Sequence, residues 1–168
     1  FTGTGNALNN TIRGNTGDDT LYGAGGNDHL DGGDGVDTAD YSRAAGSVSA
    51  SLTAQATTAD GDGGADTLVN IENLIGSAFN DVLAGDAGVN IINGGAGDDH
   101  ISGGAGADVL RGGLGIDTVH YDDAASGVVV RLNLNRADED GFGASDILAG
   151  FENVVASLGT ALTAGQVE

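Results

Sequence analysis

The sequence has no cysteine, proline, methionine, tryptophan or lysine, and several of these absences exclude a class of protein. Five arginines are its only basic residues apart from three histidines, which disfavours nucleic acid as a partner, because phosphate binding needs Lys and Arg. No apolar stretch approaches the roughly 20 residues needed to span a bilayer. With three tyrosines and four phenylalanines in 168 residues, the interior must be built from small aliphatic side chains. The lack of cysteine is compatible with an extracellular setting.

What the sequence has instead is acid and glycine. It contains 25 acidic residues, 21 of them Asp, together with 32 glycines, and its formal net charge is -20. Asp combined with Gly is typical of turns rather than helices. Folding brings these like charges together, so the bare chain should stay open or marginally stable unless cations join it. The composition therefore indicates a missing counterion.

A nine-residue repeat organises both the acid and the glycine. Four units run from residue 5 to 40 and five from 76 to 120, as in GGAGDDHIS at 94–102 and GGLGIDTVH at 112–120. A longer repeat encloses them, because GGDGVDTADY at 32–41 matches GGLGIDTVHY at 112–121, an offset of 80 residues. We expect two modules that form one continuous solenoid. Module 1 is 5–84, with block 5–40, segment 41–75 and a new block from 76; module 2 is 85–164, with its block to 120 and segment 121–155.

Each unit reads as six turn residues followed by a three-residue strand. The eighth residue is aliphatic and should point inward, while the seventh and ninth face solvent. Two units, or 18 residues, should complete one coil. The inward residues are Ile12, Leu21, Leu30, Ala39, Leu83, Ile92, Ile101, Leu110 and Val119.

The segments after each block lack the repeat but contain strand-like runs at 48–52, 67–75, 128–134 and 146–155. We expect wider coils that continue the solenoid. The alternative is a separate hairpin docked on the roll.

Strand spacing indicates which cation fits between the coils. Adjacent strands lie about 4.7–4.9 Å apart, and oxygens on opposite sides of a calcium ion stand roughly 4.6–5.2 Å apart. Magnesium would want about 4.2 Å and near-ideal octahedral geometry. Zinc prefers His and Cys ligands. The repeat therefore predicts several calcium ions, Ca2+, held between stacked turns.

The units GGDGVDTAD, GGAGDDHIS, GGAGADVLR and GGLGIDTVH fit GGxGxDxUx, and on these motifs the chain resembles the RTX calcium-binding family of bacterial secreted proteins. The resemblance implies an all-β fold, a right-handed parallel β-roll or β-helix solenoid with calcium between its turns. It also implies that the sixth residue of each unit is a metal ligand. These residues are Asp19, Asp28, Asp37, Asp81, Asp99, Asp108 and Asp117, with Asn10 and Asn90 departing from the pattern.

A neutral Asn oxygen should make a weak site or none, and GSAFNDVLA lacks two glycines, which puts Asp81 in doubt. The expected stacked pairs are Asp19 with Asp37, Asp81 with Asp99, Asp99 with Asp117, Asn10 with Asp28 and Asn90 with Asp108. The fifth-position residues Asp18 and Asp98 should face solvent.

The acidic loops 59–66 and 137–146 could be further calcium sites or ordinary solvated loops. Their candidate ligands are Asp60, Asp62, Asp66, Asp138, Asp140 and Asp146. An EF-hand is excluded, since Ile71 and Ala149 stand where its bidentate Glu belongs. Glu72 and Glu152 are candidates for capping or ligation.

The remaining polar residues point to no catalytic centre. His29, His100 and His120 occupy outward strand positions and are expected to have a plain surface role rather than a catalytic or zinc-binding one. Tyr41 and Tyr121 close their blocks, and we favour a cap over a sugar-stacking platform. No nucleophile or acid–base pair is evident, so we expect no enzyme activity in this chain.

The resemblance also implies a setting. The chain begins at Phe1 without Met or a secretory signal, so we expect a piece of a larger bacterial protein, exported by type I secretion and folded by extracellular calcium. Alternatives are a structural or adhesive repeat of a calcium-dependent surface layer or adhesin, with self-association or contact to cell surfaces or polysaccharide, or an accessory module of a secreted polysaccharide-modifying enzyme or protease.

Overall fold

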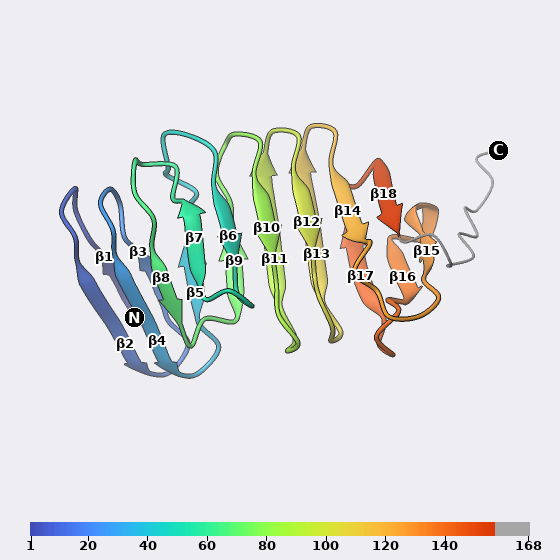
Figure 1. The fold of residues 1–168 in the computed structure, drawn as a ribbon, viewed down its shortest axis with the longest axis horizontal. Coiled ribbons are helices and arrows are strands. Elements are labelled where there is room, and N and C mark those ends of the chain that lie inside the picture. The colour runs from blue at the N-terminus through green and yellow to red at the C-terminus, as the bar shows by residue number, and fades with distance from the viewer. Residues whose placement is uncertain (157–168) are drawn as a thin grey trace.

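The computed structural model describes residues 1–156, which form two long β-sheets facing each other (Figure 1). Sheet A contains, in spatial order, β1 (Thr2–Thr4), β3 (Thr20–Tyr22), β5 (Thr38–Asp40), β9 (Asn73–Ile75), β11 (Ile91–Ala96), β13 (Val109–Leu114), β17 (Asp146–Ala149), β16 (Arg136–Glu139) and β15 (Val129–Arg131). Sheet B contains β18 (Asn153–Ala156), β14 (Thr118–Tyr121), β12 (His100–Ser102), β10 (Val82–Ala84), β6 (Ser49–Ser51), β7 (Ala56–Ala59), β8 (Thr67–Val69), β4 (His29–Asp34) and β2 (Thr11–Thr16). One short 3-10 helix, η1 (Leu132–Leu134), follows β15.

The strand register confirms a coil of two units. Within each block, parallel neighbours pair residues 18 apart, as in Thr11 with His29 and His100 with Thr118. Successive units therefore alternate between the sheets, and every second unit stacks on the same edge. The predicted all-β parallel β-roll is thus the fold of the described residues.

The core is a double column of aliphatic side chains between the sheets. Of the nine residues predicted to point inward, eight are at most 1 % exposed, and Ile12 is half-buried against the same core. Burying a Leu or Ile side chain contributes about 1.5–3 kcal/mol. The repeated aliphatic position therefore supplies most of the hydrophobic stabilisation that a chain with few aromatics can obtain.

The segments between the blocks depart from a plain wide coil. β6, β7 and β8 pair antiparallel inside sheet B, and β15, β16 and β17 do the same in sheet A. The segment thus continues the solenoid through a hairpin that belongs to the sheet, rather than through a wider turn or a hairpin docked outside. The sequence analysis missed the strands β7 and β16.

Two runs predicted as single strands are each divided between the sheets. The run 67–75 forms β8 in sheet B and β9 in sheet A, and 146–155 is divided into β17 and β18. The break falls at Asn70 (φ 51°) and Gly150 (φ +70°), both in the left-handed region. Asn and Gly tolerate this conformation, so the chain can turn sharply there.

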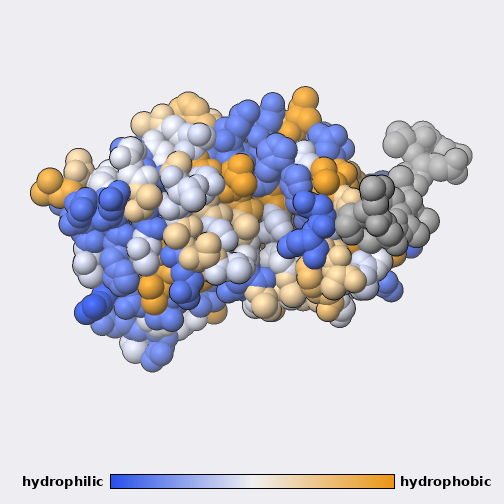
Figure 2. Space-filling view, in the orientation of Figure 1, coloured by the Kyte–Doolittle hydropathy of each residue, from blue (hydrophilic) through white to orange (hydrophobic). Residues whose placement is uncertain are grey.

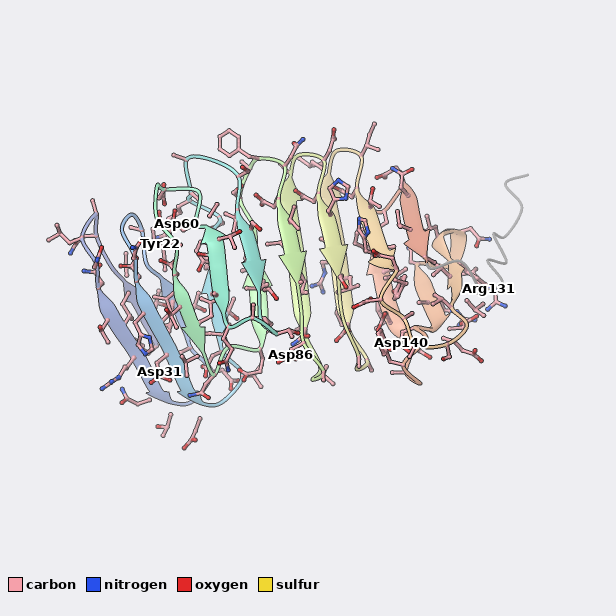
Figure 3. The ribbon with its side chains drawn as sticks, viewed as in Figure 1. Tyr22, Asp31, Asp60, Asp86, Arg131 and Asp140 are labelled. Carbon is pink, nitrogen blue, oxygen red and sulfur yellow. The ribbon has the colours of Figure 1, made fainter. Side chains whose placement is uncertain are left out.

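Residues 80 apart lie in opposite sheets. β5 is in sheet A and its counterpart β14 in sheet B, while the hairpin β6–β8 is in sheet B and its counterpart β15–β17 in sheet A. Figure 3 accordingly shows Asp60 and Asp140 at opposite edges of the roll. The last part of the predicted second module, 157–164, lies outside the described residues.

The face shown in Figure 2 is mixed in character. Hydrophobic residues on it occur in small groups among hydrophilic ones. The part of the chain that the structure describes has no helix with the length and hydrophobicity needed to span a bilayer.

Candidate metal sites

The sixth residues of stacked units form a ladder along each edge of the roll. In seven of the nine units the backbone N–H of the sixth residue donates to the side-chain Oδ1 of the aspartate stacked on it in the next coil, at 2.7–3.0 Å. The structure stacks Asn10 with Asp28, Asp19 with Asp37, Asp28 with Asp66, Asp81 with Asp99, Asn90 with Asp108, Asp99 with Asp117 and Asp108 with Asp146. All five pairs expected from the sequence are included.

The ladder uses only one oxygen of each carboxylate. The second oxygen, Oδ2, is buried without a hydrogen-bond partner in Asp19, Asp28, Asp37, Asp99, Asp108 and Asp117. A buried carboxylate oxygen without a donor costs free energy, more than a neutral acceptor would. Six orphaned oxygens at equivalent positions therefore indicate a partner that the chain does not encode.

Backbone conformation separates these six units from the other three. In units 14–22, 23–31, 32–40, 94–102, 103–111 and 112–120, the second and fourth residues both have positive φ. The second residues are Asn15, Ala24, Gly33, Gly95, Gly104 and Gly113. We call these six units open turns. The units 5–13, 76–84 and 85–93 have no positive φ at either position, and we call them closed turns.

In a closed turn the chain satisfies its own sixth residue. The second residue donates its N–H to that side chain: Asn6 to Asn10 at 2.7 Å, Asp86 to Asn90 at 2.8 Å, and Ser77 to Asp81. In an open turn the second residue makes no such bond, and Oδ2 stays free. Asn10, Asn90 and Asp81 are the three residues at which weaker sites are expected, and that expectation stays a prediction.

The first glycine of each unit is needed for space rather than for φ. A Cβ added to Gly94 would lie 2.2 Å from Asp99 Oδ2 and 2.6 Å from the carbonyl oxygen of Gly112, one coil further on. At Gly14 the same distances are 2.2 Å to Asp19 Oδ2 and 2.4 Å to the Gly32 carbonyl. A carboxylate oxygen without a partner and a carbonyl oxygen of the next coil therefore border one small space, which a side chain at this position would fill.

These oxygens fit a hard cation. Residues 1–156 contain no group of three or more His, Cys, Asp or Glu side chains placed to hold a metal by themselves. The ligands would have to combine single carboxylates with backbone carbonyls, which is an all-oxygen set typical of Ca2+. The open turns provide both kinds of oxygen at the boundary between two coils.

The acidic loops contain one further candidate each. Asp60 Oδ1 accepts N–H groups from Asp62 and Gly64, and Asp140 Oδ1 accepts those of 142–144. The Oδ2 atoms of Asp60 and Asp140 are buried and unpartnered, as in the open turns. These two residues remain candidate ligands.

The other four loop candidates already have partners. Asp66 and Asp146 accept the hydroxyl groups of Tyr41 and Tyr121 through Oδ2, at 3.1 and 2.7 Å. Their second carboxylate oxygen is therefore hydrogen-bonded, whereas that of the open-turn aspartates is free. Asp62 accepts Tyr22 Oη–H and the Ala45 N–H. Asp138 is paired with Arg131 and Arg136.

A second ladder, made by the fifth residues, was not anticipated. Asp98 Oδ1 accepts the Ile116 N–H at 2.9 Å, and Asp18 Oδ1 accepts the Val36 N–H at 3.0 Å. Both carboxylates are exposed, as expected. The sequence signal was the recurrence of Asn or Asp at this position, since both can accept an N–H.

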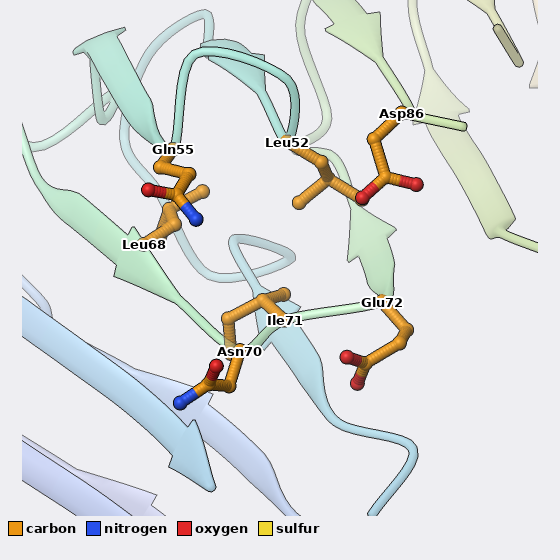
Figure 4. A pocket seen from close by; sticks show the side chains of 7 residues that line it. All are labelled: Leu52, Gln55, Leu68, Asn70, Ile71, Glu72 and Asp86. Carbon is orange, nitrogen blue, oxygen red and sulfur yellow. The ribbon is translucent and has the colours of Figure 1, made fainter. Parts of the chain in front are cut away.

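Glu72 and Glu152 act as caps of the first ladder. Glu72 Oε2 accepts the Asp37 N–H at 2.7 Å, and Glu152 Oε2 accepts the Asp117 N–H at 2.8 Å. Glu72 also lines a cavity of about 190 Å³ with Asp86, Leu52 and Gln55 (Figure 4). Asp86 Oδ1 accepts the Gly88 N–H, so both carboxylates that line this cavity already accept a backbone N–H group.

Burial raises the pKa values of the ladder carboxylates when no cation is bound. Desolvation raises the pKa of Asp99 to about 6 and that of Asp108 to about 7, against opposing hydrogen bonds from Asp81 and Asn90. Desolvation likewise raises the pKa values of Asp28, Asp37 and Asp117. The charged form is therefore costly in the folded chain unless a cation accompanies it.

The pH dependence of stability should consequently reverse with calcium. Because the folded pKa values lie above the unfolded ones, the calcium-free fold is stabilised below about pH 4, and this stabilisation is lost as pH rises through about 6 to 7. With calcium, stability should instead rise from pH 5 to 8, since only carboxylates bind the ion. Circular dichroism of the calcium-free chain from pH 4 to 8, and thermal unfolding in calcium at pH 5 and pH 8, measure this. Asp108→Asn should flatten the calcium-free profile, and a calcium-free β-signal that rises with pH would contradict the assignment.

The comparisons with known proteins agree with this geometry. No curated protein matches the chain. The family model described as RTX calcium-binding nonapeptide repeat (four copies) matches residues 4–39, 70–99 and 85–119, slightly more than half of the sequence. These ranges cover all nine units except Asp40 and His120, the last residue of each block. The chain therefore belongs to the RTX calcium-binding nonapeptide repeat family.

Proposed function

We propose that this chain is a calcium-dependent folding region, in which the six open turns hold Ca2+ between successive coils. The observation that supports it is the set of buried, unpartnered Oδ2 atoms found in every open turn. The proposed ligands are Asp19, Asp28, Asp37, Asp99, Asp108 and Asp117, together with backbone carbonyls of the next coil. Asp60 and Asp140 are proposed as ligands at the two hairpin loops.

In this proposal calcium supplies positive charge at the coil boundaries, and the chain supplies the geometry. The open turns place acceptors from two coils around one space, and the hydrogen-bonded parallel strands fix the distance between those coils. Calcium would thus bind only where two coils are correctly stacked. A chain that binds calcium only when stacked is stabilised by RT ln(1 + [L]/Kd) for each independent site.

The proposed setting is extracellular. Cytosolic calcium would be too scarce to fill the sites, so the chain would stay extended and compatible with type I secretion from a bacterium. Millimolar calcium outside the cell would fold it, as part of a larger secreted or surface protein. The net charge of -20 supports this, because it opposes folding of the ion-free chain.

We also propose that residues 5–84 and 85–164 are two copies of one module. In both copies the tyrosine that ends the block donates to an aspartate of the hairpin, Tyr41 to Asp66 and Tyr121 to Asp146. In both copies a glutamate caps the last rung. These recurring bonds support duplication of the whole module rather than of the nonapeptides alone.

Calorimetric titration should detect several calcium ions per chain and no comparable heat with magnesium. The reason is that the strand spacing suits the longer bonds and irregular geometry of Ca2+. A chain that binds both ions equally, or neither, would contradict the proposed sites. Asn10→Asp is a matched test of the closed turns. Asn6 still donates its N–H to residue 10 in this variant, so the ion count should not change.

A further inference from the structure

Two of the three histidines face each other on neighbouring strands of sheet B. His100 begins β12, and His120 lies on the parallel strand β14 beside it (Figure 1). His100 Nδ1 lies 2.8 Å from His120 Nε2, with ring centroids 5.0 Å apart. His29 on β4 has only threonines, Thr11 and Thr67, as its cross-strand partners.

A carboxylate fixes the orientation of one ring. His120 Nδ1 lies 3.2 Å from Asp122 Oδ1. An ionised carboxylate can only accept, so Nδ1 of His120 carries the proton and Nε2 presents its lone pair toward His100. Two ring nitrogens thus converge on one point, and one of them is held there by an acidic neighbour.

We propose that His100 Nδ1 and His120 Nε2 bind a divalent transition-metal ion such as Zn2+, with Asp122 as the residue that orients His120. Neutral imidazole is a common ligand of such ions, and ligating histidines usually donate their second N–H to a carboxylate or carbonyl. With His120 Nε2 as the acceptor, His100 Nδ1 is the donor in the observed contact, so binding requires that His100 carry its proton on Nε2 instead, which faces away from the ion. The sequence predicted a plain surface role for these histidines, because their pairing is not visible in one dimension.

The geometry and charge suit this ligand. Two nitrogens about 2.0–2.1 Å from one tetrahedral ion stand roughly 3.3 Å apart, so the rings must separate by about half an ångström from the observed contact. His100 is exposed and has room for this movement, and water can complete the coordination. The net charge of -20 favours a cation over an anion between the rings. Calcium, which takes oxygen ligands, does not compete for this site.

The test is titration of Zn2+ into the whole chain in saturating calcium, followed by calorimetry and by the ring-proton NMR signals of the three histidines. We expect one zinc ion that shifts the signals of His100 and His120 but not of His29. His100→Ala and His120→Ala should each weaken binding at least tenfold. Asp122→Asn should weaken it about tenfold, as expected for loss of an orienting partner.

His29→Ala is the matched control, since it removes a histidine from an outward position on a strand of the same sheet and should leave zinc binding unchanged. Zinc that binds His100→Ala as tightly as the parent chain, or that shifts no histidine signal, overturns the proposal and assigns the ion to the carboxylates. Calcium binding is measured separately in each variant. Failure of the zinc site is therefore distinguishable from failure of the calcium sites.

Discussion

Removing calcium should abolish the two sheets, and returning it should restore them. In chelator we expect the far-ultraviolet circular dichroism of a disordered chain, and in millimolar calcium that of a β-protein. The expected effect is large, because one ion contributes about 2.7 kcal/mol when free calcium is 100 times Kd. Six open turns would together match or exceed the about 5–15 kcal/mol that holds a typical domain folded.

The ion-free chain has few means to compensate. Its 25 acidic residues face five arginines, and six ladder carboxylates are buried with an unsatisfied oxygen. The core consists of single aliphatic residues stacked along each sheet, with Tyr41 and Tyr121 as the largest buried side chains. Hydrophobic burial on this scale is set against strong charge repulsion, so the cation decides the balance.

Two controls separate specific binding from general screening of charge. Magnesium at the same concentration, and sodium chloride at the same ionic strength, should produce much less β-structure than calcium. A full β-signal in chelator that calcium leaves unchanged would falsify calcium-dependent folding. Equal recovery with sodium chloride would assign the effect to screening.

The sequence predicts the core of this fold well, because the same aliphatic position recurs every nine residues. Leu21, Ile101 and Val119 occupy that position, and all three are fully buried. Equivalent positions of a repeat have equivalent surroundings, so an inward position identified in one unit predicts the inward position of every other unit. The 18-residue coil and the stacked ladder follow from the same regularity.

The hairpins could not be predicted in the same way. β7 (ATTA) and β16 (RADE) have no strong alternation of apolar and polar residues, and they become strands through antiparallel pairing with their neighbours. Tertiary context decides such segments more than their own propensity does. The turns at Asn70 and Gly150 were visible only as residue types that tolerate positive φ.

The sequence indicated which three units depart from the pattern, but not the backbone conformation that divides open from closed turns. Glycine content is an incomplete guide, since Asn15 and Ala24 adopt positive φ in open turns. A turn is closed when the second residue donates its N–H to the sixth side chain, as Ser77 does to Asp81. That bond competes directly with a cation for the same oxygen. The sequence singled out the same three residues, Asn10, Asn90 and Asp81, by residue type and missing glycines, but the backbone conformation and the N–H bond that satisfy them required the structure.

Asp99→Asn should remove calcium binding at its coil boundary, while Asp98→Asn should not. The two residues are adjacent, and each accepts one backbone N–H from a neighbouring coil through Oδ1, so Asn preserves that bond in both. They differ in Oδ2, which is buried and free in Asp99 only. In Asp99→Asn an NH2 group would face the acceptors near Gly94, and the cation site would lose its anionic ligand.

The expected loss for Asp99→Asn is at least one ion and about 2.7 kcal/mol of stability at 100-fold excess calcium. Asp98→Asn should keep the ion count and change stability by less than about 0.5 kcal/mol, as exposed substitutions usually do. In chelator Asp99→Asn should not reduce the residual β-signal, because burial raises the pKa of this carboxyl to about 6 and the variant removes a costly buried charge.

Asp81→Asn provides the control for burial. Asp81 is as buried as Asp99, but its Oδ2 already accepts the Ser77 N–H, so the variant should lose about 1 kcal/mol and no ion. Calorimetry gives the ion count, and urea unfolding in calcium gives the free energies. Equal ion counts in the Asp99, Asp98 and Asp81 variants would refute the ligand assignment. A loss in the Asp99 variant alone would tie calcium to the free oxygens of the open turns.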